Sequence, residues 1–383
     1  MLRRIAVPSA VSVLILLTAC SADNTAIGSP EPTFLGSSPT AVVPEVTADA
    51  PFPAARCEAN KAAGVITYLS SFDFAASASI VDVVMASTAH YYEAMCLDVV
   101  YKPSFSVDNY PLVAANEVQF SSGGSFSEMV DFAGANDAGF VALAVEGRTG
   151  IDTLITKDGA VPTLADIKGK KIGVKGAITP SVKAMLAKQG LVEGTDYNTV
   201  LLDGFDPTVH IEVPDIVGFP GYKSNEPNQL TAAGIKFKAY DPADFAIPGS
   251  FGILYTNQQF LTEHPSAAQD FMRATMRGLA DALADPTLAA TTCVDLINSL
   301  GNTLHLSADG ELARWNVESK LVADSATVDA PLGLPLIDQL TAEVTAYAAI
   351  GLFNGVVPMI DTLVDASVLA GIYDKGTLIW PKV

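Results

Sequence analysis

The chain has 383 residues, of which 49% are hydrophobic and 17% charged, enough for two ordinary domains without a disulfide scaffold. Its 42 acidic and 22 basic residues give a net charge of −20, which argues against nucleic acid or anionic lipid headgroups as main partners, because both are polyanions. The cysteines and histidines are scattered without the spacing of a metal site. Composition therefore predicts an acidic protein of two lobes.

The first twenty residues have the three parts of an export signal. Arg3 and Arg4 are basic, residues 5–17 are mostly apolar, and Leu17-Thr18-Ala19-Cys20 supplies small residues before a cleavage point. The apolar stretch is too short to span a membrane as a mature helix. The last four residues resemble the lipobox of bacterial lipoproteins, which implies that Cys20 receives a diacylglyceryl group and becomes the new N-terminus. The alternative is an ordinary secretory signal with an incidental cysteine.

Residues 20–56 are predicted to form a flexible tether behind the signal peptide of residues 1–19. The segment is rich in Pro, Ala, Ser and Thr, and it has few large apolar groups to offset the entropy lost on ordering. About 35 flexible residues have an r.m.s. reach of roughly 30–35 Å. The tether would therefore keep a globular domain near the extracytoplasmic face of the cell membrane.

Three cysteines remain once Cys20 is lipidated. Cys57 lies just before the first predicted strand and Cys96 at the end of the first helix, so both are expected at one edge of one lobe. An oxidising compartment permits a bridge between them, worth roughly 3–4 kcal/mol in the chain-entropy model. Cys293 lies in an apolar helical pattern and is predicted to be a small buried side chain. A pairing with Cys293 stays open from the sequence.

Strand-like and helix-like segments alternate from residue 65 to residue 145. The first helix is predicted to follow Ser79 as N-cap, with Asp82 three residues later, and Ser125 with Glu128 is predicted to form a capping box for the next helix. The strand-like runs are Val65–Leu69, Leu97–Tyr101, Glu117–Phe120 and Phe140–Val145. This alternation predicts an α/β fold with a mostly parallel sheet and helices on both faces.

A second set of such segments begins near Thr163. Thr179-Pro180-Ser181 is predicted to start a helix, because proline is favoured at the first helical position. After His264-Pro265 the pattern is helical to about Leu369. One face of the first helix predicted there carries Phe271, Thr275, Leu279 and Leu283 at intervals of four residues. The remaining predicted elements are a short helix at Leu164–Ile167 and strands at Lys171–Val174, Asp215–Phe219 and Phe251–Tyr255.

Three segments resemble one family of solute-binding proteins. Leu164–Val174 resembles the "DLKGKKIAV" segment of periplasmic-type binding proteins, and Tyr222–Pro227 resembles the Asn-Glu-Pro stretch of the nitrate/sulfonate/taurine and thiamine-pyrimidine-precursor subgroup. Phe260–Pro265, running into Phe271–Thr275, resembles the helix after that subgroup's second hinge. The similarity covers about residues 62–370 in matching order. Cys96 stands where the subgroup usually carries glycine, which supports the proposed disulfide.

The resemblance implies the two-lobed periplasmic-binding-protein type II fold, an α/β fold in which each lobe is a mostly parallel sheet flanked by helices. Lobe 1 would comprise residues 58–152 and 257–383, and lobe 2 residues 153–256. Two crossing segments would join the lobes. The ligand would lie in the cleft between them, at the carboxyl ends of the parallel strands, and a hinge motion would close the lobes over it.

Two loops of lobe 1 supply candidate ligand contacts. Phe72 and Phe74 would sandwich a planar ring, each stack worth about 0.5–1.5 kcal/mol beyond buried area, and Asp73 would accept from an amino group. The alternative puts one phenylalanine in the core and makes Asp73 a helix cap. Ser122-Gly123-Gly124-Ser125 would let backbone N–H groups approach a ligand oxygen or anion, or would form only a tight turn.

Two further loops supply the candidates of lobe 2. The backbone N–H groups of Lys175, Gly176 and Thr179 would also approach a ligand oxygen or anion, because these residues lie between a strand end and a helix start. Lys175 would add a positive charge, or would be an ordinary surface lysine. The strongest side-chain candidates are Tyr222, Asn225 and Glu226, because they follow a predicted strand and match the family segment. Glu226 would accept two hydrogen bonds from a nitrogen heterocycle, or would bond to nearby loop backbone.

The sequence has no serine-hydrolase elbow, phosphate loop or dinucleotide-binding glycine motif. It also lacks the cysteine-rich iron-site run of the pyrimidine-synthesis enzymes that share this fold. We therefore predict no catalytic residue, metal or cofactor. We expect a monomeric, lipid-anchored solute-binding protein that delivers a small molecule to an ABC permease, rather than an exported enzyme or a surface interaction protein.

The preferred ligand is a planar nitrogenous solute, such as a thiamine-type pyrimidine precursor. The aromatic residues and the acidic Asp73 and Glu226 favour it. The alternative is an alkanesulfonate, taurine or nitrate, which would favour Lys175, Arg148 and helix N-termini. A solvated surface position is the ordinary expectation for Arg148.

Overall fold

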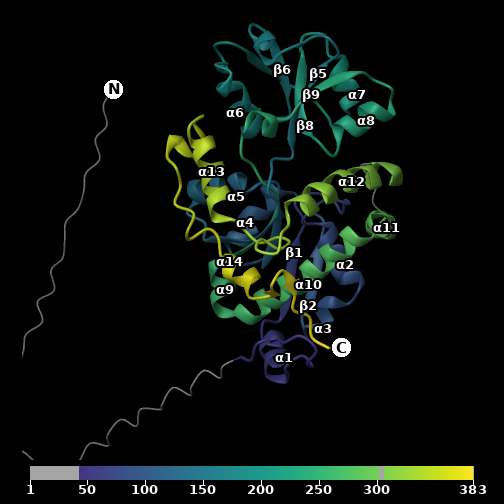
Figure 1. The fold of residues 1–383 in the computed structure, drawn as a ribbon, viewed down its shortest axis with the longest axis vertical. Helices are drawn as coiled ribbons and strands as arrows, with labels where there is room; N and C mark the ends of the chain where they lie inside the picture. Colours follow the sequence, from purple (N-terminus) through teal and green to yellow (C-terminus); the bar gives the residue numbers. More distant parts are fainter. Residues whose placement is uncertain (1–42, 302–305, 383) are drawn as a thin grey trace, which may run out of the picture. The chain divides into compact units, whose positions relative to one another are not determined.

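The first lobe is built around a five-stranded sheet (Figure 1). The computed structural model describes residues 43–301 and 306–382, so the predicted signal peptide, Cys20 and the first part of the tether lie outside the described residues. β1 pairs in parallel with β2 and β3, whereas β10 runs antiparallel between β3 and β4. In spatial order the strands are β2 (Asp98–Lys102), β1 (Val65–Leu69), β3 (Phe120–Gly123), β10 (Phe251–Asn257) and β4 (Phe140–Gly147).

The second lobe contains a three-stranded and a two-stranded ladder. β5 lies antiparallel between β8 and β9, and β6 pairs in parallel with β7. A backbone hydrogen bond from Val217 N to Lys171 O, 2.9 Å long, brings the start of β8 beside β6. The strands are β5 (Asp152–Lys157), β6 (Lys171–Val174), β7 (Asn198–Leu201), β8 (Gly218–Tyr222) and β9 (Phe237–Tyr240).

The two lobes repeat one order of strands. In each lobe the second strand lies beside the first, the first beside the third, and the fourth is separated from the third by one antiparallel strand. That antiparallel strand arrives from the other lobe: β5 follows β4, and β10 follows β9. The α/β fold predicted from the sequence, two lobes with mostly parallel sheets flanked by helices, is therefore confirmed.

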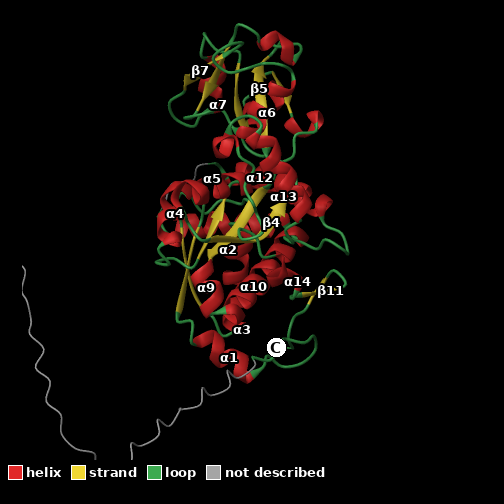
Figure 2. Ribbon diagram, turned by 90° about the vertical axis from the view of Figure 1, so that its left-hand side faces the viewer, coloured by secondary structure: helices red, strands yellow, loops and turns green. Residues whose placement is uncertain are grey.

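Helices cover both faces of the first-lobe sheet (Figure 2). Among the described residues no helix has the length and apolar content needed to cross a membrane. The helices of the first lobe are α1 (Ala54–Lys61), α2 (Val81–Thr88), α3 (Tyr91–Ala94), α4 (Ser106–Ala114), α5 (Phe126–Asn136), α9 (Gln258–Glu263), α10 (Pro265–Ala284), α11 (Pro286–Ser299), α12 (Ala308–Ser325), α13 (Ile337–Ala348) and α14 (Ala366–Ala370). Those of the second lobe are α6 (Pro180–Lys188), α7 (Pro207–Glu212) and α8 (Glu226–Ala232). Short 3-10 segments lie at Leu164–Ile167, Pro242–Phe245 and Leu352–Gly355, and β11 (Tyr373–Asp374) and β12 (Thr377–Leu378) form a small hairpin.

The predicted helix starts at residues 125, 180 and 265 are confirmed. The Ser125 side chain caps α5 by accepting from Glu128 N, and Pro180 and Pro265 lie in the first turns of α6 and α10. α10 buries Phe271 in the first-lobe core, where its ring stacks on Phe120 with the ring centres 3.9 Å apart. The four-residue spacing along α10 thus marks the face that packs on the core.

The predicted Ser79 cap is wrong. α2 begins two residues later, at Val81, and Ser79 has a positive φ of 61°. Its hydroxyl donates to Ala78 O at 2.6 Å instead of accepting from the helix. Its own N–H is held by the buried carboxylate of Glu146, so that a distant side chain fixes this turn.

Two strands lie further along the chain than predicted, and one strand belongs to the other lobe. β3 is shifted because Phe120–Gly123 pairs with β10, and β8 is shifted to Gly218–Tyr222 because it pairs with β5. β10 pairs with β3 and β4, so the second crossing ends before Phe251 rather than at residue 256. β5, β7 and β9 were not predicted, although the centre of β5 is buried. All these differences come from pairing across long sequence distances.

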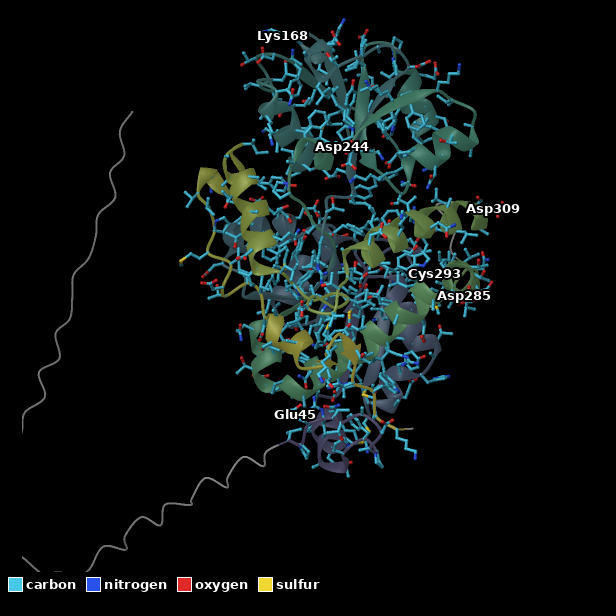
Figure 3. The ribbon with its side chains drawn as sticks, in the orientation of Figure 1. Glu45, Lys168, Asp244, Asp285, Cys293 and Asp309 are labelled. Carbon is cyan, nitrogen blue, oxygen red and sulfur yellow. A yellow bond between two sulfur atoms is a disulfide. The ribbon has the colours of Figure 1, made fainter. Side chains whose placement is uncertain are left out.

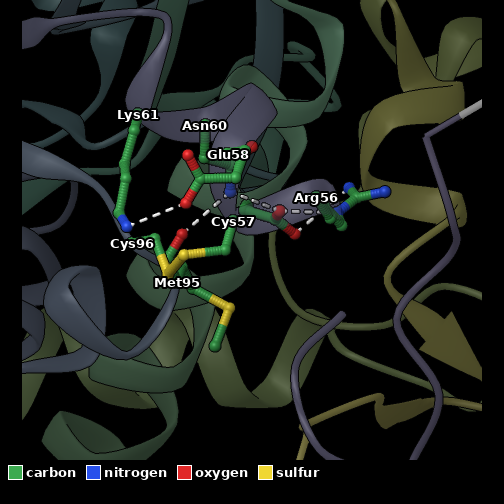
Figure 4. Close-up of a disulfide and its surroundings, with 8 residues drawn as sticks. Arg56, Cys57, Glu58, Asn60, Lys61, Met95 and Cys96 are labelled. Atoms are coloured by element: carbon green, nitrogen blue, oxygen red, sulfur yellow. Dashed lines mark hydrogen bonds and ion pairs between the residues drawn. A yellow bond between two sulfur atoms is a disulfide. The ribbon is translucent and has the colours of Figure 1, made fainter. Parts of the chain in front are cut away.

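The N-terminal helix α1 is fixed to the first lobe by a disulfide and a buried ion network (Figure 4). Cys57 and Cys96 are bonded, with a Cα–Cα distance of 5.2 Å, and Cys293 on α11 is a buried thiol (Figure 3). Asp270 of α10 accepts hydrogen bonds from Arg56 at 2.6 Å and from Asn60 at 2.8 Å. The residues before α1 are also attached, because Val46 is buried and Lys382 N donates to Ala50 O at 2.8 Å. The predicted flexible tether of residues 20–56 is therefore wrong for its described part, from residue 43 onward.

Two segments cross between the lobes where Gly150 and Gly249 meet. A Cβ atom built on Gly249 would lie 2.7 Å from the Cα atom of Gly150 and 2.8 Å from its nitrogen. A Cβ atom built on Gly150 would meet the Gly249 Cα atom at 3.9 Å, an ordinary contact. The crossing therefore requires glycine at position 249 but not at position 150.

We expect Gly249→Ala to lower the free energy of unfolding by about 1–3 kcal/mol, because backbone must shift to accept the methyl group. Gly150→Ala is the matched control, and it should leave stability close to wild type. Thermal unfolding of the two variants measures the difference. Equal stability of the two variants would show that the crossing is not packed as the structure has it.

Candidate functional site

A cavity of about 1130 Å³ lies between the lobes, and we call it the interlobe cavity. Loops that follow β1, β2, β6 and β7, the end of β8, and the start of α12 contribute to its wall. Asp309, labelled in Figure 3, lies in the first turn of α12. The side chains used below are Phe72, Ser77, Phe105, Asp152, Lys175, Thr179, Phe205, Tyr222, Ser224, Asn225, Glu226, Arg314 and Glu318.

Aromatic rings from both lobes line the interlobe cavity. Phe72 contacts Phe105 edge to face, with ring centres 5.7 Å apart, on the first-lobe side. Phe205 and Tyr222 lie on the second-lobe side, and the two residues are 67% and 44% exposed. Exposed rings on opposite walls can stack on a flat guest, because aromatic faces pair in offset geometry.

The other predicted residues of the first lobe lie away from the interlobe cavity. Phe74 is buried against Tyr101 in the core, and the Asp73 carboxylate accepts from Phe74 N at 3.0 Å. Ser122 and Gly123 belong to β3 rather than to a loop, and the Ser122 hydroxyl accepts from Ser71 N at 2.7 Å. None of these four residues lines the interlobe cavity, so the structure does not bring them to the site, and their contact with a ligand stays a prediction.

Gly124 and Ser125 line a second, much smaller cavity of about 20 Å³. This cavity also touches Asp152 and Tyr222, which line the interlobe cavity as well. Its volume corresponds to about one or two water molecules. These two predicted residues therefore adjoin the site without facing its main space.

Lys175 and Glu226 lie together on the second-lobe wall. Lys175 Nζ is 3.0 Å from Glu226 Oε1 and 5.3 Å from the centre of the Phe205 ring. Glu226 Oε2 accepts from Tyr222 N at 2.7 Å, so both carboxylate oxygens have partners. The Lys175 charge is thus neutralised by Glu226, and the predicted pairing of Glu226 with a ligand would have to share these partners.

Thr179 and Gly176 differ in their relation to the site. Thr179 lines the interlobe cavity, and its hydroxyl is buried with no hydrogen-bond partner among the described residues. Gly176 has a φ of 102°, a conformation that favours glycine, and it lies outside the wall. Its contribution is to the shape of the loop between Lys175 and Thr179.

Sequence reasoning missed the wall that α12 supplies. Arg314 and Glu318 face the interlobe cavity, and Arg314 Nη1 is 3.0 Å from Glu311 Oε2. Because α12 returns from far along the chain, no local motif connects it to the strand ends. Phe105 was also missed, although its place after β2 was a usable signal under the strand-end rule.

Hydrogen bonds link α12 of the first lobe to the segment around α8 of the second. Ser224 Oγ donates to Glu318 Oε1 at 2.7 Å, and Asn228 Nδ2 donates to Ala313 O at 3.2 Å. Asn225, one of the predicted site residues, accepts weakly from Arg314 Nη2 at 3.5 Å. These contacts hold one side of the interlobe cavity together.

Arg148 serves neither as a ligand contact nor as a solvated surface side chain. Its guanidinium donates to the carbonyl oxygens of Ala330 at 3.0 Å, Pro331 at 2.7 Å and Leu334 at 3.0 Å, and also to Ser325 O. Burial lowers the pKa of Arg148. The side chain therefore fixes the loop that follows α12.

Two carboxyl groups are buried together behind the first-lobe wall. Asp82 and Glu146 are almost fully buried, and three of their four oxygens have no hydrogen-bond donor among the described residues. Burial raises the pKa of Asp82 to about 6 and raises that of Glu146 well above its ordinary range. The nearby Asp82 charge also raises the Glu146 pKa. The pair therefore holds a proton at mildly acidic pH.

A family model described as "NMT1/THI5 like" matches residues 77–289. The riboflavin-binding protein RibY of Chloroflexus aurantiacus is 26% identical over 284 residues, which cover 72% of this chain and 73% of RibY.

Solved structures share the fold at low sequence identity. The sulfonate-binding protein SsuA of Methylobacillus flagellatus KT has a TM-score of 0.59 at 15% identity, over 80% of this chain and 92% of its own. The nitrate-binding protein NrtA of Synechocystis has a TM-score of 0.55 at 13% identity, over 80% and 88%. The desulfurization enzyme DSZB has a TM-score of 0.52 at 12% identity, over 80% and 98%. Binding proteins and an enzyme therefore share this architecture.

The buried pair predicts that stability falls as pH rises from about 4 to 7. Below its folded pKa of about 6, Asp82 keeps its proton in the folded chain while it ionises in the unfolded one, so deprotonation favours unfolding. A rise of its pKa from 3.8 to about 6 corresponds to about 3 kcal/mol when fully developed. Denaturation at pH 4.5 and 7.5 measures this difference.

Asp82→Asn should reduce the pH dependence without abolishing it, because the amide cannot ionise whereas burial still raises the pKa of Glu146, of Glu128 and of Asp152. Asp374→Asn, a change at an exposed residue, is the control and should keep the wild-type slope. A wild-type stability that increases between pH 4.5 and 7.5, with no change of slope in Asp82→Asn, would contradict the assignment.

Proposed function

Because the chain belongs to the NMT1/THI5-like family, we propose that it is an extracytoplasmic solute-binding protein that captures a small molecule in the interlobe cavity and delivers it to an ABC importer. The lipobox-like segment ending at Cys20 supports a lipid anchor, and the tether would keep a monomeric receptor beside its permease. Closure of the two lobes at their crossing segments would enclose the guest. The division into lobe 1 and lobe 2, with the second boundary moved to about residue 250, belongs to this proposal.

The preferred guest is a planar nitrogen heterocycle without negative charge. The observation that carries this choice is the pairing of both cationic side chains in the described cavity wall. Lys175 is bound by Glu226, and Arg314 by Glu311. Carboxylates such as Asp152 and Glu318 remain in excess in the same wall. An anionic guest would meet no unpaired cation there, whereas the exposed rings suit a flat neutral guest.

The size of the interlobe cavity favours a guest of several fused rings over a single pyrimidine. A volume of about 1130 Å³ is slightly larger than that of ordinary small-molecule sites, which are about 300–1,000 Å³. The relative RibY is named for binding riboflavin, whose ring system is flat and rich in nitrogen. A thiamine-type pyrimidine precursor would leave much of the space to water. We therefore put a flavin-like ring system first and the pyrimidine second.

Calorimetry with riboflavin, an aminopyrimidine and methanesulfonate tests the proposal. We expect heat of binding from riboflavin, weaker or no heat from the aminopyrimidine, and none from methanesulfonate. The recovered ligand should be chemically unchanged, since the proposal makes the protein a carrier rather than an enzyme. Tight binding of methanesulfonate with no response to either heterocycle, or conversion of a bound compound, would overturn it.

Substitutions at Tyr222 test the stacking directly. Tyr222→Ala should weaken riboflavin binding by roughly tenfold, because it removes a stack and its buried area. Tyr222→Phe keeps the ring and should bind within about twofold of wild type. If both variants bind as wild type does, the guest does not stack on this residue.

A further inference from the structure

The carboxylate of Glu318 occupies a site built from donors of both lobes. Its Oε2 atom accepts from Ser77 Oγ at 2.8 Å and from Ala78 N at 2.7 Å, both in the turn before α2. Its Oε1 atom accepts from Ser224 Oγ at 2.7 Å, on the second lobe. Only 3% of Glu318 is exposed, yet it lines the interlobe cavity together with both serines.

These donors form the kind of site that binds an oxyanion. Two hydroxyl groups and one backbone N–H converge on a pair of carboxylate oxygens, a geometry that a sulfonate, phosphate or ligand carboxylate could equally satisfy. Burial raises the Glu318 pKa, and the hydrogen bonds from Ser224 and Ala78 together with the positive charge of Arg314, one turn earlier on α12, oppose that rise. The site is therefore suited to a negative charge, and the protein supplies that charge itself.

The neighbouring N–H groups of the same turn are also taken. Ala76 N donates to Glu311 Oε2 at 2.9 Å, and Ser79 N donates to Glu146 Oε2 at 2.9 Å. Ser77 N donates to Ala75 O at 2.8 Å. With Ala78 N bound by Glu318, every N–H from residue 76 to residue 79 is engaged, so an incoming anion finds no free backbone donor in this turn.

We propose that the Glu318 carboxylate occupies the place that an anionic ligand would take. Glu318 thereby excludes anions from the interlobe cavity, and it links the two lobes through Ser224. The inference deepens the proposed function by naming the residue that restricts its guests to those without negative charge. Removing the Glu318 carboxylate vacates a site with three donors directed into it and Arg314 nearby. The variant should therefore gain affinity for an oxyanion that the wild type rejects.

Glu318→Ala and Glu318→Ser test this gain of function with methanesulfonate as probe and dimethyl sulfone as its uncharged analogue. We expect methanesulfonate to bind both variants at least roughly tenfold more tightly than wild type, because charge-assisted hydrogen bonds form in the vacated space. It should also raise their melting temperature, since a ligand that binds the folded state stabilises it. Dimethyl sulfone should do neither.

Two further variants separate specificity from structure. Glu343→Ala removes a buried carboxylate that accepts from Ser127 N at 3.1 Å but does not line the interlobe cavity, so it should gain no response to methanesulfonate. Ser224→Ala breaks the link to the second lobe while keeping the Glu318 charge. It should raise the radius of gyration measured by X-ray scattering without creating anion binding.

The outcomes are distinct. Equal responses of Glu318→Ala, Glu318→Ser and wild type to methanesulfonate would overturn the inference. If a variant does not fold alone, refolding with each probe decides: recovery with methanesulfonate alone supports the inference, and equal recovery with both probes contradicts it. Riboflavin binding by the wild type is measured separately, so a failure of the proposed function is distinguished from a failure of this inference.

Discussion

The crossing at Gly150 and Gly249 is the constraint on which the rest of the structure depends. Each segment that crosses there enters the opposite lobe as an antiparallel strand, β5 or β10, so each sheet incorporates a strand delivered from the other lobe. This arrangement brings the carboxyl ends of the parallel strands of both lobes to one space. The interlobe cavity is therefore a direct result of the topology, and the loops around it are free to determine what it binds.

Internal charge pairing determines the chemistry of that space. The cations in the described wall are held by the protein's own glutamates, and so are backbone N–H groups before α2. The groups in this cavity that would attract an anion therefore already have partners within the protein. What remains accessible is aromatic surface, such as Phe205 and Tyr222, and carboxylate oxygen. The fold is shared with proteins named for sulfonate and nitrate binding, but the chemistry of this wall favours a different class of guest.

The sequence predicted the fold well because its signals are local. Proline at the start of α6 and α10 and β-branched runs in β1 and β4 identify elements without knowledge of their neighbours. Strand ends and lobe membership depend on distant pairing, which is why β3 and β8 were displaced and β10 was assigned to the wrong lobe. The prediction of the site was limited in the same way, because it also depended on local signals. Residues next to strand ends, such as Phe72 and Tyr222, line the cavity, whereas Glu318 on α12 had no local signal.

Capture of an unmodified, uncharged ring compound between the lobes is the central claim, and native mass spectrometry tests it most directly. The protein would be purified from its own host without denaturant and its released ligand identified. The account predicts one molecule of a flat, nitrogen-containing compound per chain, with lower occupancy when Tyr222 is replaced by alanine and wild-type occupancy in the phenylalanine variant. An oxyanion bound in that stoichiometry, or a compound that the protein converts during incubation, would contradict it.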